Sequence, residues 1–298
     1  MLVVAIDIGG TFTDLMAFDD QTGRFSDAKS LTTPSHLVQG IIDCIKKSGL
    51  QSSAIDELIH GSTTAINTLI ERKGAKTGLI VTQGTRDVLT IGREIRYELY
   101  DLNLELPKPL VAEDKRLEAG ERMDVEGNVV QALAPIEMDR LMAALGKLDI
   151  DAVGVCFLHA YVNDAHEKQV EAAIRARFPK LAVSISSNIA REIREFERAS
   201  TVAANAYVGP QTSEYIAEFH RNLRAGGFEG SLLMMGSHGG VLSTERVRRE
   251  PIALVESGPV GGCIGAGGTA CDTGAGEYCS GGVCVPGGGC NAPSTRAR

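Results

Sequence analysis

Apolar residues recur along the chain with two different spacings: short runs or alternate positions, which predict strands, and every third or fourth position, which predicts helices. The apolar runs Leu2–Ile6 and Leu15–Phe18 have the length of strands, and a segment rich in Gly, Thr and Asp joins them. Downstream, the pattern predicts a strand at Arg24–Leu31, a helix at His36–Lys47, a strand at Leu58–His60, a helix at Ala65–Lys73 and a strand at Thr77–Thr82.

The later part of the chain alternates helix and strand more regularly. Residues 85–135 show no clear period and predict irregular structure. The charged run Arg191–Arg198 is interpreted as a solvated helix face. The remaining elements predicted are helices at 136–148 and 163–177, strands at 152–158 and 181–186, a helical region at 192–223 broken near Pro210, a strand at 231–235 and a short helix capped by Ser243. This alternation indicates an α/β protein with a parallel or mixed sheet flanked by helices.

Composition narrows the class of protein. A length of 298 residues predicts about two domains, and a net charge of −8 argues against nucleic acid as the main partner. The first apolar run meets Asp7 without a basic segment before it, and no stretch is long enough to span a membrane. We therefore expect a cytoplasmic protein with no membrane partner.

The cysteines divide into two groups. Cys44, Cys156 and Cys263 lie in apolar surroundings and are interpreted as reduced core residues. The segment Cys271–Arg298 is rich in Gly, Cys and Pro and has hardly any apolar period. It predicts a disordered tail, or alternatively a segment that follows the loss of the reading frame near Ala270.

The Gly-, Thr- and Asp-rich segment carries the first candidate chemistry. No helix is predicted directly after it, so the pattern is strand, glycine turn, strand, which differs from a P-loop. Glycines let backbone N–H groups approach phosphate oxygens, threonines donate from their hydroxyls, and carboxylates bind Mg²⁺ through water. An ordinary hairpin turn remains the alternative. The candidate residues are Gly9, Gly10, Thr11, Thr13 and Asp14 for the phosphates of ATP and Mg²⁺, with Asp7 as a water-mediated Mg²⁺ ligand.

Further candidates lie in two polar loops that follow predicted strands. His60 precedes the first loop, where it could contact a substrate or orient a water, although a histidine bonded to backbone fits equally well. With Asp7, it completes the candidate catalytic pair. The cleft candidates are Thr63, Thr64 and Asn67 in and after the first loop, and Ser237 and His238 in the second, for which a plain turn is the alternative.

Several segments, in order, resemble one family. The hairpin Asp7–Asp14 resembles the first phosphate motif of actin-like ATPases. The segments similar to the N-terminal part of the hydantoinase A and 5-oxoprolinase family are His60–Asn67, Glu71–Ala75, Gly84–Asp87, Glu192–Arg198, Asn205–Pro210 and Glu256–Pro259. The resemblance covers about residues 1–270. It implies an actin-like ATPase (ribonuclease H-like) α/β fold, a mixed sheet with flanking helices and an incomplete second half. The domains expected are 1–180 for the N-terminal domain, 190–270 for the beginning of the hydantoinase A domain, and 271–298 for the tail.

The resemblance also implies a function. Members of the family open cyclic amides such as N-methylhydantoin or 5-oxoproline with ATP and Mg²⁺, related enzymes act on ketones, and a hydantoinase B type subunit is a common partner. The family's second Gly-Gly-Thr hairpin does not occur in this sequence. We therefore expect the chain to be a fragment with little or no ATPase activity alone. The alternatives are an actin-like small-molecule kinase that shares only the hairpin, and a non-enzymatic partner-binding fragment.

Overall fold

The computed structural model describes residues 1–9, 11–32, 37–95, 98, 100–258, 260, 279–280 and 283–284. The chain forms two compact units. Unit 1 consists of Met1–Asn67, Ile216–Val247 and Ala253–Arg298, and unit 2 consists of Thr68–Tyr215 and Arg248–Ile252. The chain therefore leaves unit 1 and returns to it, and the domain bounds expected from the sequence, 1–180 and 190–270, stay a prediction.

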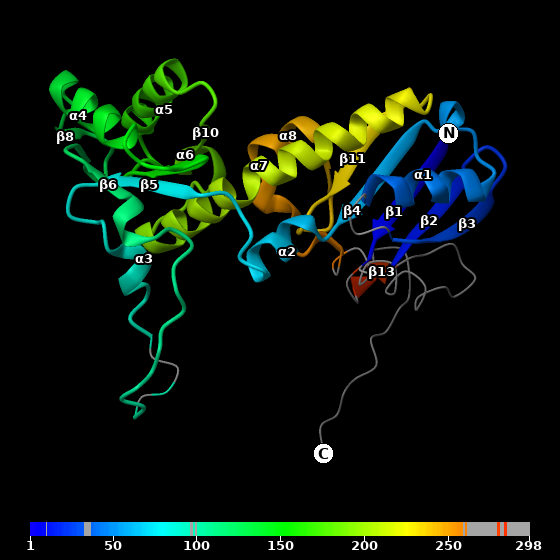
Figure 1. Ribbon diagram of the computed structural model, residues 1–298, viewed down its shortest axis with the longest axis horizontal. Coiled ribbons are helices and arrows are strands. Elements are labelled where there is room, and N and C mark those ends of the chain that lie inside the picture. Colours follow the sequence, from blue (N-terminus) through cyan, green and yellow to red (C-terminus); the bar gives the residue numbers. More distant parts are fainter. Residues whose placement is uncertain are drawn as a thin grey trace. The chain divides into compact units, whose positions relative to one another are not determined.

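Unit 1 is built on a six-stranded mixed sheet in the order β12-β11-β4-β1-β2-β3 (Figure 1). β1, β2 and β3 form an antiparallel meander, while β4 and β11 run parallel to β1. This arrangement confirms the predicted hairpin and third strand. The strands are β1 (Leu2–Ile8), β2 (Phe12–Asp19), β3 (Arg24–Leu31), β4 (Glu57–Ser62), β11 (Ser231–Met235) and β12 (Val241–Ser243).

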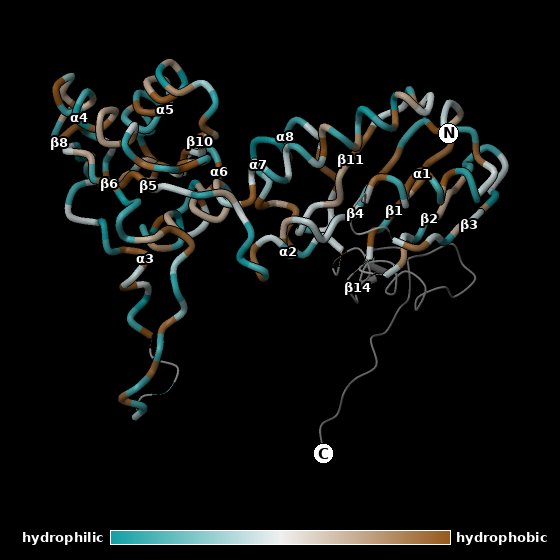
Figure 2. The backbone as a smooth tube through the Cα atoms, viewed as in Figure 1, coloured by the Kyte–Doolittle hydropathy of each residue, from teal (hydrophilic) through white to brown (hydrophobic). Residues whose placement is uncertain are grey.

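One face of this sheet is covered by helices. The apolar run of β1 (Figure 2) places Val4 and Ile6 in the core, beside Leu15 of β2. Helix α1 (Leu37–Ser48) packs over β2 and β3, and its Cys44 thiol donates to the carbonyl of Thr13 at 3.1 Å. The described part of unit 1 also contains η1 (Ser52–Ala54), α2 (Thr64–Ile70, which extends into unit 2), the part of α7 (Glu195–Ala225) from Ile216 onward, α8 (Thr244–Arg249, which extends into unit 2) and η3 (Pro251–Leu254, which begins in unit 2).

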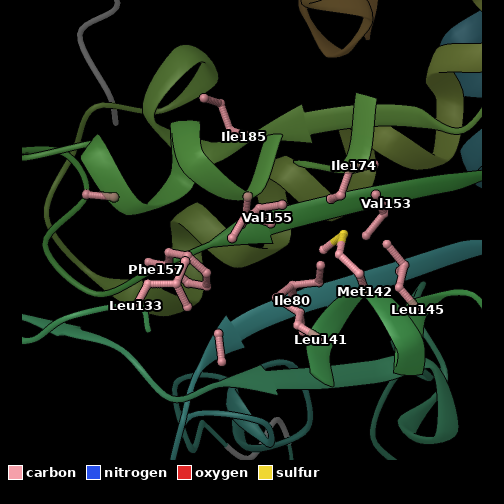
Figure 3. Close-up of a cluster of buried hydrophobic side chains, with 13 residues drawn as sticks. Ile80, Leu133, Leu141, Met142, Leu145, Val153, Val155, Phe157, Ile174 and Ile185 are labelled. Carbon is pink, nitrogen blue, oxygen red and sulfur yellow. The ribbon is translucent and has the colours of Figure 1, made fainter. Parts of the chain in front are cut away.

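Unit 2 contains a four-stranded parallel sheet in the order β10-β9-β5-β6. Its core lies between this sheet and helices α4 and α5, where Leu141 and Ile174 meet Ile80, Val155 and Phe157 (Figure 3). The strands are β5 (Thr77–Thr82), β6 (Arg116–Ala119), β9 (Ala152–Cys156) and β10 (Ala182–Ile185). The helices are α3 (Val88–Ile91), η2 (Glu113–Lys115), α4 (Pro135–Leu145), α5 (Ala165–Arg177) and α6 (Ser186–Ile189).

The expectation that residues 85–135 are irregular is wrong in part. β6 pairs in parallel with β5, and β7 (Arg122–Met123) pairs with β8 (Val129–Gln131). These strands are only two to four residues long, and β6 is buried at both ends rather than at alternate positions. A period of two is therefore not visible in the sequence.

The predicted break near Pro210 is also wrong. Helix α7 runs without interruption over Glu195–Ala225 with Pro210 inside it. Proline costs a helix one backbone hydrogen bond, but packing overrides propensity where the flanking turns are buried. Val208 and Thr212, on either side of Pro210, are both fully buried.

The interpretation of Arg191–Arg198 as a solvated face fails at its last residue. Arg198 is only 1% exposed. Its guanidinium donates to the carbonyl of Phe157 at 2.8 Å and to the hydroxyl of Ser186, and it lies 3.6 Å from the carboxylate of Glu167. Burial raises the pKa of Glu167. Arg198 of helix α7 thus forms hydrogen bonds at the carboxyl ends of β9 and β10.

Smaller features of the described residues complete the picture of the fold. Cys44 and Cys156 are free and buried, as predicted, whereas Cys263 lies outside the described residues. Ser243 caps α8 by accepting from the backbone N–H of Arg246 at 3.2 Å. Within the tail, the structure describes the strand pair β13 (Cys279–Ser280) and β14 (Val283–Cys284). None of the helices in the described ranges is long and apolar enough to cross a membrane.

Candidate functional site

Three parallel strands of unit 1 end at one edge of the sheet, and polar loops follow each of them. β1 is parallel to β4, and β4 is parallel to β11, so their carboxyl ends meet. The β1–β2 turn, the segment from Ser62 to Asn67 and the loop from Gly236 to Gly240 follow these three ends. Carboxyl edges of parallel strands are where ligands bind in open α/β sheets.

Two carboxylates face each other at this edge. Asp7 of β1 and Asp14 of β2 are directly opposed in the antiparallel ladder. Partial burial, followed by the negative charge of Asp14, raises the pKa of Asp7. Lys29 of β3 neutralises Asp14 at 2.7 Å. Opposed like charges are destabilising across a ladder, so Asp7 is the group that a bound cation would stabilise.

The backbone around Asp7 is kept free of side chains. A Cβ added to Gly61 would lie 2.9 Å from the Asp7 carboxylate oxygen Oδ1, and one added to Gly258 would lie 3.8 Å from it. Ser257 fixes the second of these segments, because its hydroxyl donates to the carbonyl of Ser62 at 3.0 Å. The glycines leave space beside the carboxylate, as an oxygen-ligated, partly hydrated Mg²⁺ requires.

A cavity of about 700 Å³ opens beside these groups. Asp7, Asp14, Gly61, Ser257 and Gly258 line its polar end. Apolar side chains of the sheet line the rest, and this is large enough for a small-molecule ligand. Ser257 and Gly258 were not among the candidates from the sequence, although their segment Glu256–Pro259 was singled out as a motif.

The hairpin turn is placed as predicted, but not all of its residues face the edge. The backbone N–H of Gly9 donates to the carbonyl of Phe12 at 2.9 Å, so the turn itself uses that donor. Thr11 is exposed, while Gly10 lies outside the described residues. Thr13 is fully buried on the face that α1 covers, and its hydroxyl is paired with that of Thr32 at 3.2 Å. Strand alternation explains this, because Thr13 shares its face with core residues.

His60 lies in the core rather than at the edge. Its side chain is fully buried in β4, its Nδ1 lies 3.2 Å from the carbonyl of Ile6, and its ring meets that of Phe219 edge-on at 4.9 Å. Burial lowers the pKa of His60 to about 4. The ring is therefore neutral near pH 7 and lacks the exposure that contact with a substrate requires, which fits the backbone-bonded alternative.

The residues after β4 form a small hydrogen-bonded turn. The Ser62 hydroxyl donates to that of Thr64 at 2.9 Å and accepts from the backbone N–H of Thr64 at 3.2 Å. The side-chain amide of Asn67 donates to the Thr63 hydroxyl at 3.3 Å. These contacts hold Thr63 and Thr64 at the carboxyl edge, so both stay candidates for lining the cleft. Asn67 positions Thr63 through its hydrogen bond.

The loop after β11 has a compact, closed form. The Gly236 N–H donates to the carbonyl of Gly240 at 2.7 Å, and the Ser237 N–H donates to the carbonyl of Ala253 at 2.8 Å. A Cβ on Gly236 or Gly240 would lie within 3 Å of the His238 imidazole, so the ring lies over bare backbone. Ser237 and His238 are both exposed. The loop brings Ser237 and His238 to the same edge of the sheet. Its hydrogen bonds are also those of an ordinary turn, which was the alternative interpretation of this loop.

Comparison with known sequences identifies two family regions. A profile described as "Hydantoinase/oxoprolinase N-terminal region" matches residues 3–178, and one described as "Hydantoinase/oxoprolinase" matches residues 198–280. An uncharacterized protein of Methanocaldococcus jannaschii is 38% identical over 264 residues, which cover 88% of this chain and 39% of that protein. The acetophenone carboxylase gamma subunit of Aromatoleum aromaticum is 30% identical over 284 residues, covering 88% of this chain and 38% of the subunit.

Two of the solved structures of similar fold are those of ATP-dependent enzymes. Nucleotide-free acetone carboxylase superimposes with a TM-score of 0.77 at 24% identity, covering 89% of this chain and 40% of the matched chain. ATP-dependent caprolactamase from Pseudomonas jessenii superimposes with a TM-score of 0.76 at 27% identity, with the same coverage of 89% and 40%. The fold is thus the predicted actin-like ATPase type of α/β fold. The chain spans about two fifths of the length of these relatives.

Proposed function

The chain belongs to the hydantoinase/oxoprolinase family, and from this membership we propose that it supplies one phosphate-binding half of an ATP-dependent enzyme that opens a cyclic amide. The observation that carries the proposal is the opposed pair Asp7 and Asp14 beside Gly61 and Gly258, at the polar end of the cavity. This set combines acidic oxygens for a cation with bare backbone for close approach by phosphate.

The roles of the residues follow from their positions. Asp7 would hold Mg²⁺, and Asp14 would add negative charge that its ion pair with Lys29 partly neutralises. Thr11, Thr63 and Thr64 would supply hydroxyl donors to the phosphates from the carboxyl edge. Thr13 and His60 are left out of the site because both are buried on the covered face. Gly9 shapes the turn, since its N–H is already used within it.

The chemistry that ATP supplies is phosphorylation of the amide oxygen, which makes the ring carbon susceptible to water. Protein groups promote phosphoryl transfer mainly by positioning and charge stabilisation. The residues named above fit that demand, because they hold cation and phosphate without a nucleophile of their own. Ser237 and His238 are placed to line the neighbouring substrate side of the edge.

A ketone is the second candidate substrate class. It is favoured by the 30% identity to the acetophenone carboxylase gamma subunit and by the TM-score of 0.77 to acetone carboxylase. In both proposed functions ATP activates an oxygen atom of the substrate. The substrate is a cyclic amide in the first and a ketone in the second. A small-molecule kinase explains the hairpin but not the two family regions, and a non-enzymatic fragment explains neither the acidic pair nor the cavity.

The chain is proposed to work in the cytoplasm with further protein, either the rest of a family chain or a hydantoinase B type subunit. The test co-expresses the 298-residue chain with the part of the matched Pseudomonas jessenii caprolactamase chain that lies outside the region it shares with this chain. ATP-dependent phosphate release is then measured with 5-oxoproline, N-methylhydantoin, caprolactam and acetophenone. We expect one cyclic amide to stimulate release in the complex and little release by the chain alone. Rapid turnover by the chain alone would contradict a half-site, and stimulation by acetophenone alone would favour the ketone.

A further inference from the structure

The segment that follows η3 contains one strained residue. Glu256 has a φ of 66°, and among the described residues of unit 1 no other residue except glycine has a positive φ. A residue with a Cβ atom is strained in this left-handed conformation, whereas glycine adopts it freely. Such strain persists only where neighbouring contacts fix the backbone, and it occurs preferentially at ligand sites. The contacts around Glu256 therefore bear on the candidate site.

Two hydrogen bonds hold the turn at Glu256 in place. The hydroxyl of Ser257 donates to the carbonyl of Ser62, the last residue of β4, at 3.0 Å. The backbone N–H of Val260 donates to the carbonyl of Glu256 at 3.1 Å. Ser257 and Ser62 are both buried, so water could not readily replace the bond between them. The turn is thus attached to the strand that pairs with β1.

This attachment sets how closely the next residue approaches two candidates of the site. A Cβ added to Gly258 would lie 3.8 Å from Oδ1 of Asp7 and 3.5 Å from Cγ2 of Thr63. The backbone of Gly258 therefore lies next to both side chains. A binding site requires its groups to be placed within roughly 0.5 Å of the productive geometry. A shift of the turn would consequently alter the surroundings of Asp7.

We propose that Ser257 is a positioning residue of the phosphate site: its hydroxyl holds the strained turn at Glu256 in the geometry that places Gly258 beside Asp7. The inference rests on the proposed function, because Asp7 is the Mg²⁺ ligand of that proposal. Ser257 acts through the backbone of Gly258 and does not touch the ligand itself. A hydroxyl that only stabilised the fold could be removed without any loss of ligand affinity, and this difference can be measured.

The first test compares Ser257→Ala with Thr13→Val in the 298-residue chain. Both side chains are fully buried in unit 1, and each substitution removes the hydrogen bond of a hydroxyl. Both variants should lower the Tm by roughly 2–4 °C. Only Ser257→Ala should also weaken the Mg²⁺-dependent binding of a non-hydrolysable ATP analogue in calorimetry, by about fivefold or more. Equal affinities of the two variants would overturn the proposal.

The second test needs no nucleotide. Glu256→Gly should raise the Tm by roughly 2–4 °C, because glycine adopts the left-handed conformation without strain. In the Ser257→Ala background the turn can relax, so the same substitution should raise the Tm by less than about 1 °C. Glu229→Gly is the matched control and should not raise the Tm. Glu229 is an exposed residue of unit 1 that lies outside helix and strand and has no positive φ.

Together the two tests separate this inference from the proposed function. Equal gains in Tm from Glu256→Gly in both backgrounds would show that Ser257 does not hold the turn, and the inference would fail whatever the nucleotide does. If the gain depends on Ser257 and yet the unmodified chain binds no nucleotide, the proposed function fails. The role of Ser257 at the phosphate site then fails with it, while its hold on the turn stands.

Discussion

The substitution Arg198→Met tests whether the buried charged cluster of unit 2 holds that unit together. Arg198 is 1% exposed and contacts Phe157, Ser186 and Glu167. Removing its charge leaves the Glu167 carboxylate buried without a cation and the Phe157 carbonyl without this donor. Loss of one partner of a buried pair costs about 3–5 kcal/mol. In a unit of this size about 1 kcal/mol lowers the Tm by roughly 2–4 °C, so we expect a decrease of roughly 10 °C.

The assay is thermal unfolding and urea unfolding, both followed by circular dichroism, with Arg191→Met as the matched control. Arg191 belongs to the same sequence run but is 61% exposed in its pair with Asp164 at 2.9 Å. Surface pairs contribute about 0–1 kcal/mol, so the control should lose little. Adding Glu167→Gln to Arg198→Met removes the unpaired charge. The double variant should therefore be more stable than the sum of the single effects by about 1 kcal/mol. Additive effects, or a loss from Arg198→Met no larger than that from Arg191→Met, would refute the role assigned to the cluster.

Three further predictions concern unit 1. Burial lowers the pKa of His60 from 6.5 to about 4, so the stability that the neutral imidazole contributes is complete above pH 6.5 and is lost as the pH falls toward 4. In urea unfolding between pH 7 and pH 5, the unmodified chain should lose about 2 kcal/mol more than His60→Leu loses. Equal losses in the two proteins would contradict this. Thr13→Val should cost about 1 kcal/mol of stability, because the Thr13 hydroxyl is hydrogen-bonded to that of Thr32. The affinity for nucleotide, measured by calorimetry, should stay within about twofold, because this hydroxyl does not contact the ligand. A large loss of affinity would show that Thr13 belongs to the binding site. Gly61→Ala places a Cβ 2.9 Å from Oδ1 of Asp7. The affinity for nucleotide should therefore fall by several-fold, while the Tm stays nearly unchanged. Unchanged affinity would show that Asp7 is not a ligand of the bound Mg²⁺.

Local patterns predicted most elements of this fold, because period and turn chemistry act over a few residues. β5 runs over Thr77–Thr82 as expected, and the hairpin before Arg24 has the predicted form. The failures share a different cause. Arg198 and Pro210 both lie in α7, where burial against distant segments decides the outcome, and no local pattern carries that information.

The candidate site shows the same division. The acidic pair at the hairpin was predictable, since Asp7 and Asp14 are seven residues apart around one tight turn. The contribution of Gly258 was not, because nearly two hundred residues separate Ser62 from the Ser257 hydroxyl that binds its carbonyl. His60 was misplaced because β4 continues to Ser62, two residues beyond the predicted strand, and its alternation turns the ring into the core.

The central claim is that the Asp7 edge of unit 1 binds Mg²⁺ and the phosphates of ATP. Titration of the 298-residue chain with a non-hydrolysable ATP analogue and Mg²⁺, followed by calorimetry, tests it most directly. Asp7→Asn should weaken binding by about tenfold or more. The matched control Asp43→Asn should bind as the unmodified chain does, because Asp43 lies on α1 and pairs with Gln39 at 2.8 Å. Equal affinities of all three proteins, or no Mg²⁺-dependent binding by the unmodified chain, would contradict the account.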